Sequence, residues 1–411
     1  MRPLVAILHH PRSFFPLDLF HQVGEGATLL WVVDGGSAGD ATASRLLRRL
    51  GPVVDISGLD ADRAASAVGA HRPQGIVSFV DDHVEMAAAL ADRLGLIYHS
   101  PDVARTVVDK RLQRAAMDKA GVPGPRYWSV PAGLPAVEVG RLIEQLSFPA
   151  VLKPARGSGS RGIRRVDDAR ALFELLGGEA SGHDCLVEEY LNDAPQLKEW
   201  MGSYLSVESV VSRGRPSHVA ITGRFPLAEP FRESGNFLPG ILDPDLEEPV
   251  LGMVDQAVDA LAITDAVIHT EVKLTPDGPK LIEVNGRLGG RPPFLLHDVS
   301  PVNLFQAACQ VALGQPVSFD GLAPCRGVGY WLMLQPPMSA RRVASVSGLD
   351  EVGGLAGVET VELRRTAGEA VDWREGTDSQ VLTVRGRTTD HRSLVETVDS
   401  IRLKVNIDYD T

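Results

Sequence analysis

Residues 267–287 contain two apolar stretches joined by the turn sequence Pro276–Asp277–Gly278. This arrangement is typical of an antiparallel β-hairpin. If the hairpin is centred near Asp277, residues equally far from it pair across the strands, and Glu271 lies opposite Glu283. Opposed side chains have Cβ atoms about 4.5–5.5 Å apart, so the two carboxylates repel each other unless a cation lies near them. The pattern predicts a hairpin with a cation-binding face.

The next residues of the second strand add to this face, since side chains two apart share one side of a strand. Asn285 supplies an amide oxygen, and carboxylates with an amide suit Mg²⁺. Arg287 suits a phosphate or carboxylate that the metal also holds. Gly289 and Gly290 then allow the backbone to approach a ligand closely. The alternative is an exposed acidic face, because a register slip of one residue would spoil the alignment.

A second motif is the glycine-rich stretch LKPARGSGSRGI at residues 152–163. It follows an apolar strand that ends at Lys153, and its backbone N–H groups can point at phosphate oxygens. Arg156 and Arg161 add positive charge. No Lys-Ser/Thr pair follows, so this is not a P-loop, and it lacks the dinucleotide-binding fingerprint. A flexible surface loop is the alternative interpretation.

Composition excludes several classes of function. The chain has 411 residues and a net charge of −12, which disfavours general nucleic-acid binding because phosphate contacts need a positive face. Its three cysteines, Cys185, Cys309 and Cys325, are widely spaced and indicate neither a zinc site nor a disulfide framework. No leader sequence and no apolar run long enough for a membrane span is present. We expect a soluble cytoplasmic protein with no nucleic-acid or membrane partner.

The remaining pattern predicts a mixed α/β protein. Short apolar runs at 4–8, 27–33 and 75–80 alternate with helices, which favours a parallel sheet with right-handed crossovers. One helix is expected over 102–122, ended by the Pro-Gly-Pro sequence at 123–125. Residues 223–247 are rich in Pro, Gly and charges, and we expect an irregular loop there. Further helices are expected around 136–146, 167–178, 249–262, 301–313 and 390–401.

The order of these motifs resembles that of the ATP-grasp superfamily of carboxylate–amine ligases. Asp109–Lys110, the glycine-rich loop, LVEEYL at 186–191, SVE at 206–208 and the 267–290 hairpin follow one another as in that superfamily. The resemblance covers about residues 100–315. It implies an N-terminal Rossmann-like α/β domain at 1–105, a small ATP-grasp lobe at 106–195, a large lobe at 196–318 and a C-terminal subdomain at 319–411. The closing lobe is similar to that of the dipeptide-forming L-amino-acid ligase branch.

The resemblance also implies roles for individual residues. Arg287, Glu208 and the backbone of Gly289 and Gly290 would take part in catalysis, and Glu271, Glu283 and Asn285 would hold Mg²⁺, or alternatively Mn²⁺. Glu188 would meet the adenine amino group, and Glu189, Tyr190 and Leu191 would lie along the ring. The ATP phosphates would be bound by Lys110, Lys153 and the loop residues Gly157, Ser158, Gly159, Ser160, Arg161 and Gly162.

Three further residues are expected to contact the substrate. Asn236 stands where many dipeptide-forming relatives have histidine. Arg291 stands where some relatives have an apolar residue, so it would recognise a second acidic group on a substrate or form a structural salt bridge. His269 lies two residues before Glu271 and would face the same cleft.

The implied activity is ATP-dependent joining of a carboxylate to an amine through an acyl-phosphate, with release of ADP and phosphate. The partners would be small amino-acid-like molecules, and the protein would form a homodimer. Two alternatives stay open: a ligase with another nucleophile, such as a carrier-protein thiol or another amine metabolite, and a catalytically silent ATP-binding protein.

Overall fold

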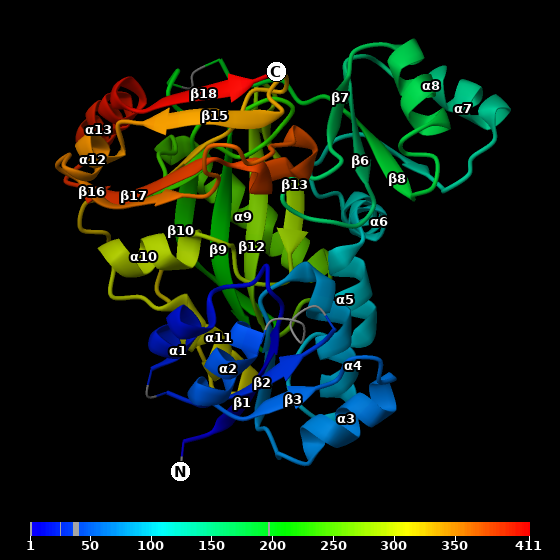
Figure 1. Ribbon diagram of the computed structural model, residues 1–411. Helices are drawn as coiled ribbons and strands as arrows, with labels where there is room; N and C mark the ends of the chain where they lie inside the picture. Colours follow the sequence, from blue (N-terminus) through cyan, green and yellow to red (C-terminus); the bar gives the residue numbers. More distant parts are fainter. Residues whose placement is uncertain (1, 25, 36–40, 196–197) are drawn as a thin grey trace.

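The computed structural model describes residues 2–24, 26–35, 41–195 and 198–411. Its first unit is a parallel sheet in the order β3-β2-β1-β4, at the bottom of Figure 1. Apolar side chains cover both faces of β1, which explains its continuous apolar sequence. The elements are β1 (Leu4–His9), α1 (Pro16–Val23), β2 (Thr28–Val33), α2 (Ala41–Leu50), β3 (Val53–Asp55), α3 (Ala61–Gly69), β4 (Gly75–Ser78), η1 (Asp81–His83) and α4 (Val84–Leu94).

Two helices, rather than the single one expected over 102–122, lead to the next unit. They are α5 (Pro101–Val108) and α6 (Lys110–Ala120). Asp109 between them is extended, and its side chain accepts a hydrogen bond from the N–H of Arg111. The residue therefore ends one helix and caps the next, which makes Lys110 the first residue of α6.

The small lobe is an antiparallel sheet in the order β5-β8-β6-β7, and Figure 1 shows it apart from the rest of the molecule at the upper right. Two helices pack on it through one apolar cluster. The glycine-rich loop joins β6 to β7. The elements are β5 (Tyr127–Val130), α7 (Ala136–Ile143), β6 (Ala150–Pro154), β7 (Arg164–Val166), α8 (Ala169–Gly177) and β8 (Cys185–Glu189).

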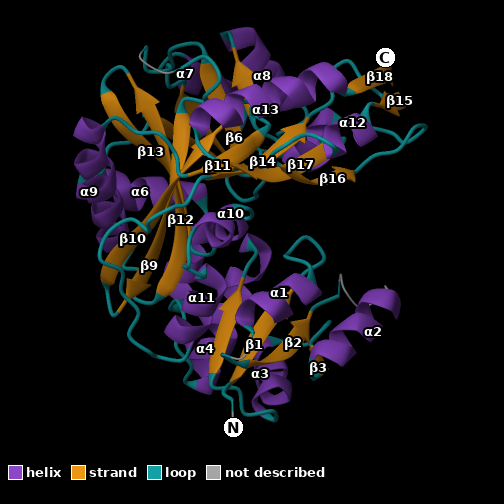
Figure 2. Ribbon diagram, turned by 90° about the vertical axis from the view of Figure 1, so that its left-hand side faces the viewer, coloured by secondary structure: helices purple, strands orange, loops and turns teal. Residues whose placement is uncertain are grey.

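The largest sheet has eight strands in the order β13-β12-β9-β10-β11-β14-β17-β16. Its helix α9 packs on one face through a continuous apolar cluster, and α10 lies beside β11 and β14 (Figure 2). The elements up to residue 312 are β9 (Tyr204–Ser212), β10 (Arg215–Arg224), β11 (Gly235–Leu238), α9 (Pro244–Ala260), β12 (Ala266–Thr275), β13 (Gly278–Asn285), α10 (Pro292–Val299) and α11 (Leu304–Ala312).

The C-terminal residues continue this sheet. Strands β14, β17 and β16 extend it beyond β11, and β15 pairs with β18 in a separate two-stranded sheet. A division at residue 318 therefore does not separate two sheets, and the four-domain division stays a proposal. The elements are β14 (Val328–Leu334), β15 (Arg342–Ser347), α12 (Leu349–Gly353), β16 (Val358–Leu363), η2 (Trp373–Ser379), β17 (Leu382–Thr388), α13 (His391–Lys404) and β18 (Asn406–Asp410).

The predicted register of the β12–β13 hairpin is confirmed. Glu271 pairs with Glu283, and His269 pairs with Asn285. A β-bulge follows Glu271 on the turn side, so the pairs nearest the site keep the register centred on Asp277. The hairpin therefore presents its polar side chains on one face, as the period of two requires.

One expectation about a loop was wrong, and one helix was not expected from the sequence. Strand β11 lies inside the stretch expected to be irregular, because its residues pair with both β10 and β14. Helix α10 begins directly after Arg291, with prolines at its first two positions. Proline stabilises the first helical turn rather than breaking it there. Among the described residues, no helix is both long and apolar enough to cross a membrane.

Candidate functional site

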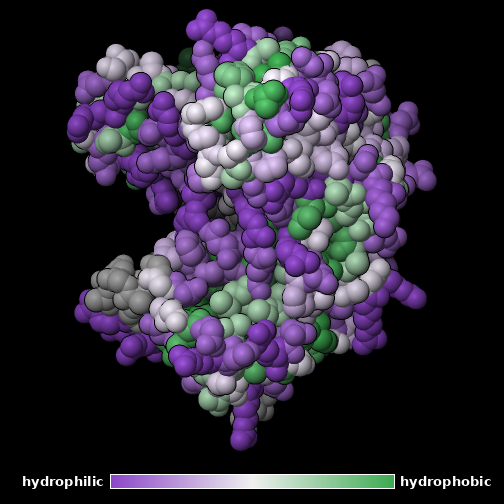
Figure 3. Space-filling view, turned by 90° about the vertical axis from the view of Figure 1, so that its right-hand side faces the viewer, coloured by the Kyte–Doolittle hydropathy of each residue, from purple (hydrophilic) through white to green (hydrophobic). Residues whose placement is uncertain are grey.

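A large cavity, with a volume of about 1690 Å³, lies where the N-terminal unit, the small lobe and the large sheet meet. Figure 3 shows the molecule hollowed on this side, with predominantly hydrophilic residues around the hollow. The volume exceeds the roughly 300–1,000 Å³ of common ligand pockets. The cavity therefore has room for a nucleotide together with smaller substrates.

Two lysines and the glycine-rich loop form one wall. The Lys110 ammonium donates to the Gly157 carbonyl at 2.8 Å and lies 3.0 Å from Oε1 of Glu283. Lys153 lies on β6, and its Nζ is 2.6 Å from Oε2 of Glu188. Burial lowers the pKa of Lys153, and the Glu188 carboxylate opposes part of that shift. The wall thus places two lysines beside a loop whose glycines leave stretches of backbone uncovered.

Glu188 is the centre of a buried charge cluster. Its Oε1 accepts a hydrogen bond from Nε of Arg114 at 2.8 Å, and its Oε2 pairs with Lys153. Burial raises the pKa of the carboxyl, but Arg114 and Lys153 outweigh it and hold the pKa below its ordinary value. Both carboxylate oxygens are occupied by these partners, so its contact with adenine stays a prediction, and its present contacts make it a counter-ion.

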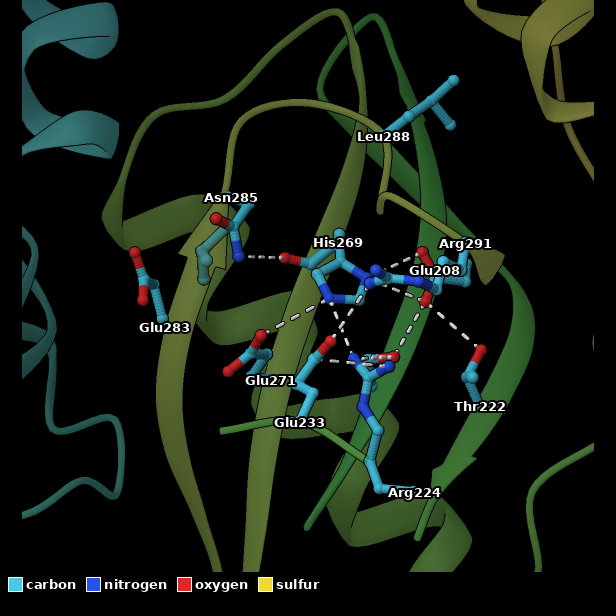
Figure 4. Close-up of polar contacts among 12 residues, drawn as sticks. Glu208, Thr222, Arg224, Glu233, His269, Glu271, Glu283, Asn285, Leu288 and Arg291 are labelled. Atoms are coloured by element: carbon cyan, nitrogen blue, oxygen red, sulfur yellow. Dashed lines mark hydrogen bonds and ion pairs between the residues drawn. The ribbon is translucent and has the colours of Figure 1, made fainter. Parts of the chain in front are cut away.

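The hairpin supplies the oxygen donors expected for a metal. Glu271, Glu283 and Asn285 line the cavity, and Figure 4 shows their side chains on neighbouring strands. Burial raises the pKa of Glu271, but His269 outweighs it and the value falls to about 2, so this carboxylate is ionised. Within the described residues no cluster of three or more His, Cys, Asp or Glu suits a metal. Two carboxylates and an amide oxygen are donors of the kind that Mg²⁺ takes together with phosphate oxygens.

Glu208 on β9 and His269 on the hairpin strand β12 form a buried pair (Figure 4). Nδ1 of His269 lies 2.8 Å from Oε1 of Glu208, and its Nε2 lies 3.6 Å from Oε1 of Glu271. Burial lowers the pKa of His269, but Glu208 more than offsets it and raises the pKa to about 9. Arg224 stands beside the ring and opposes that rise. At neutral pH the imidazolium holds the two carboxylates in place.

Arg287 is fixed by the N-terminal unit. Its Nε lies 3.0 Å from Oδ1 of Asp81 and its Nη2 lies 2.5 Å from Oδ2, a two-pronged contact. Nη2 also donates to Oδ1 of Asn285 at 3.2 Å. Such paired contacts fix the orientation of a guanidinium. Arg287 therefore lies beside the predicted metal ligand Asn285, with its direction set by Asp81.

Arg291 lies among polar and aromatic neighbours. Its Nη1 is 3.4 Å from Oε2 of Glu233, and its guanidinium lies over the Trp331 ring at 5.8 Å. Burial lowers the pKa of Arg291, and Glu233 opposes the shift. Arg224 lies 3.8 Å from the other oxygen of Glu233, so one carboxylate serves two arginines. Recognition of an acidic substrate by Arg291 stays a prediction.

The structure brings most of the predicted site residues together at the cavity and places four of them elsewhere. Those that line it are Lys110, Lys153, Gly157, Ser158, Gly159, Ser160, Arg161, Glu188, Glu189, Tyr190, Leu191, His269, Glu271, Glu283, Asn285, Arg287, Gly290 and Arg291. Gly162, Glu208, Asn236 and Gly289 are not lining residues. A Cβ on Gly289 would lie 2.6 Å from Nδ1 of His269, so this glycine packs against the buried pair, whereas Gly290 is open.

Sequence reasoning missed four charged residues of the site: Asp81, Arg114, Arg224 and Glu233. Asp81 follows the apolar run of β4, and polar residues at the carboxyl end of a parallel strand commonly face a ligand. Arg224 ends the apolar strand β10 and is 2% exposed. A charged residue at the end of an apolar strand could have indicated that Asp81 and Arg224 belong to the site. No local signal separates Arg114 or Glu233 from ordinary surface charges.

The ATP-grasp domain model matches residues 146–292. This range holds the glycine-rich loop, β8 and the β12–β13 hairpin. The mixed α/β fold expected from the sequence is confirmed. The chain contains an ATP-grasp domain.

Several known proteins are similar to the chain. Carnosine synthase 1 from Homo sapiens is 31% identical over 258 residues, which cover 58% of this chain and 31% of that protein. Alanine–anticapsin ligase from Bacillus subtilis is 25% identical over 222 residues, 49% of this chain and 46% of that one. The chain thus spans less than half the length of these two relatives. The crystal structure of L-amino acid ligase from Bacillus licheniformis superposes with a TM-score of 0.79 and 19% identity, over 100% of this chain and 99% of that one.

Proposed function

We propose that this protein is an ATP-dependent carboxylate–amine ligase that joins amino-acid-like substrates through an acyl-phosphate. The observation that carries the proposal is the single cavity, in which Lys110, Lys153 and the glycine-rich loop face the hairpin carboxylates and Arg287. Phosphoryl transfer needs mainly positioning and neutralisation of charge, and these groups supply both. The similar ligases support the same class of reaction.

The reaction has two steps. An oxygen of the substrate carboxylate attacks the γ-phosphorus of ATP, and the bond to ADP breaks. The amine nitrogen of the second substrate then attacks the acyl carbon and loses a proton, and inorganic phosphate leaves with the oxygen that came from the carboxylate. The products are an amide, ADP and phosphate. The acyl-phosphate must be shielded from water, which the loop over the cavity can do.

Different residues of the cavity have different roles in this reaction. Lys110 and Lys153 neutralise phosphate charge, and Arg287 stabilises the transferring phosphoryl group from the orientation that Asp81 sets. Glu271, Glu283 and Asn285 would hold Mg²⁺ or Mn²⁺, which supplies further charge neutralisation when bound. The Lys110–Glu283 pair at 3.0 Å keeps the carboxylate in place before the nucleotide arrives.

The substrate end of the cavity contains both signs of charge. Glu233 can accept an ammonium group, while Arg291 and the backbone at Gly290 suit a carboxylate. His269 lines this end, and Asn236 is buried outside the lining. Glu189, Tyr190 and Leu191 line the adenine end. A homodimer remains part of the proposal and is tested by light scattering.

ADP release tests the proposed function. Purified protein is incubated with ATP, Mg²⁺ and a panel of amino acids, singly and in pairs, with Glu283→Ala as the inactive control. We expect ADP release that requires a pair, together with a condensed product by mass spectrometry. Release with one acid alone indicates that the nucleophile lies outside the panel. Equal release by Glu283→Ala contradicts the assignment of the site.

A further inference from the structure

The C-terminal segment Trp373–Ser379 (η2) contacts the glycine-rich loop, although the two are far apart in sequence. The Thr377 N–H donates to the Gly159 carbonyl at 2.8 Å. Nη1 of Arg161 lies 3.4 Å from Oδ2 of Asp378. Thr377 and Asp378 also line the cavity. The segment therefore forms part of the nucleotide side of the site.

Gly376 makes this close approach possible. Its φ of +68° is in the left-handed region, and a Cβ there would lie 2.1 Å from the Gly159 carbonyl oxygen and 2.9 Å from the Arg161 nitrogen. Both are backbone atoms of the loop, so a side chain at this position cannot be accommodated unless the loop moves. The contact is thus specific for glycine.

A third contact holds the far end of the loop. The Arg164 guanidinium, at the start of β7, lies over the Trp373 ring at 4.5 Å from its centroid. On the opposite side of the loop, Lys110 donates to the Gly157 carbonyl. The loop is therefore held from both sides, by α6 on one and by the C-terminal segment on the other.

The same segment also holds the loop that carries Glu233. The Glu233 N–H donates to Oγ1 of Thr377 at 3.3 Å. Nε2 of Gln335 donates to the Glu233 carbonyl at 2.7 Å and to the Thr377 carbonyl at 3.1 Å. Arg232 reaches Oγ of Ser379 at 3.1 Å. The segment Trp373–Ser379 thus contacts both the glycine-rich loop and the loop that carries Glu233.

We propose that Trp373–Ser379 is a positioning element that holds the glycine-rich loop closed over the nucleotide and couples this closure to the Glu233 loop. The nucleotide part of the inference rests on the proposed function. Coupling between two sites is reciprocal, so nucleotide that orders the glycine-rich loop also orders the Glu233 loop through the shared segment.

Gly376→Ala tests this inference, and Gly368→Ala is the matched control. Gly368 lies in the same C-terminal region with φ +90°, and a Cβ there meets nothing within 4 Å. Both variants place a side chain on a residue with positive φ, but only Gly376→Ala adds the clash with the loop. Hydrogen exchange is measured without nucleotide, and the affinity for MgADP is measured by calorimetry.

We expect exchange of residues 157–162 in Gly376→Ala to be about tenfold faster, and the Kd for MgADP about tenfold higher, as loss of one good hydrogen bond and its contacts implies. Exchange of β14 and β17 stays at the wild-type rate, as does exchange of residues 157–162 in Gly368→Ala. In the wild type, MgADP slows exchange of residues 228–236, and Gly376→Ala weakens this effect.

Wild-type exchange at 157–162 together with wild-type affinity in Gly376→Ala would overturn the inference. If this variant does not fold, Trp373→Leu replaces it. Trp373 is half-buried, and its loss removes the ring contacts with Arg164 and with the neighbouring Arg374. Unchanged loop exchange and affinity in this variant would likewise overturn the inference. A wild type that binds no MgADP would contradict the proposed function instead, while the exchange comparison without nucleotide still decides whether the segment holds the loop.

Discussion

Glu188→Gln is the substitution whose energetic cost follows most directly from the structure. The carboxylate neutralises two cations, Arg114 at 2.8 Å and Lys153 at 2.6 Å. All three side chains are at least nine-tenths buried, with 5%, 5% and 7% exposed for Glu188, Arg114 and Lys153. Glutamine keeps the volume and one acceptor oxygen but removes the charge. Two buried cations are then left without a counter-ion.

The expected cost is about 3–5 kcal/mol in the free energy of opening the small lobe, the range for breaking a buried ion pair by removal of one partner. Lys153 limits the loss, because burial already lowers its pKa and it can release its proton when the carboxylate is gone. We therefore expect the lower end, about 3 kcal/mol.

The neighbouring residue provides a matched control. Glu189 pairs with Arg126, whose side chain is 66% exposed, and with Lys280. The side chains of Glu189 and Lys280 are 19% and 24% exposed. Water screens such pairs more than fully buried ones, so Glu189→Gln should cost clearly less than Glu188→Gln. Native-state hydrogen exchange on β6 and β8 is the assay, because a chain with several units need not unfold in one step. Equal losses in the two variants would refute the reasoning.

The effect should also depend on pH. The folded pKa of Glu188 lies below its ordinary value, so its stabilising contribution is present above the unfolded pKa of about 4.3 and is lost as the pH falls through the folded pKa. The difference in the free energy of opening between wild type and Glu188→Gln should be largest at pH 7 and should become smaller in acid. A difference that grows as the pH falls would contradict the assigned charge state.

Three further predictions concern the site and the core. Asp81→Asn should lower kcat about tenfold or more with little change in the Kd for MgADP, because it frees the orientation of Arg287 but removes no nucleotide contact; an unchanged kcat contradicts the positioning role. Removal of Mg²⁺ with EDTA should abolish ADP release and its readdition should restore it, whereas Glu283→Gln should need more Mg²⁺ for half-maximal activity; a wild-type requirement contradicts its role as a ligand. Burial raises the pKa of the Cys309 thiol to about 12, so iodoacetamide at pH 8 should label the half-buried Cys325 first, and mass spectrometry showing the reverse order would contradict this burial.

Local patterns in the sequence were enough to predict the β12–β13 hairpin and its register. The Pro-Asp-Gly turn and the alternation of side chains fix a register in which Glu271 faces Glu283, and the structure has this pairing. The parallel strands of the N-terminal unit could be predicted for the same reason, since buried strands read as apolar runs. Helix boundaries were less accurate, because Asp109 was not recognised as a cap and the helix that begins with the two prolines after Arg291 was not predicted.

Contacts between distant segments could not be predicted from local patterns. Asp81 lies 206 residues from Arg287, and Arg114 lies 74 residues from Glu188. No spacing rule links such pairs, because tertiary folding alone brings them together. The same holds for η2 against the glycine-rich loop and for the C-terminal strands that extend the large sheet.

Transfer of oxygen tests the central claim of an acyl-phosphate most directly. A substrate pair that supports ADP release is supplied with ¹⁸O in the reacting carboxylate, and the phosphate produced is analysed by mass spectrometry. An acyl-phosphate requires that one ¹⁸O atom leaves with each phosphate, because the carboxylate oxygen that attacks ATP departs when the amine attacks. Amide formation with unlabelled phosphate would contradict the account.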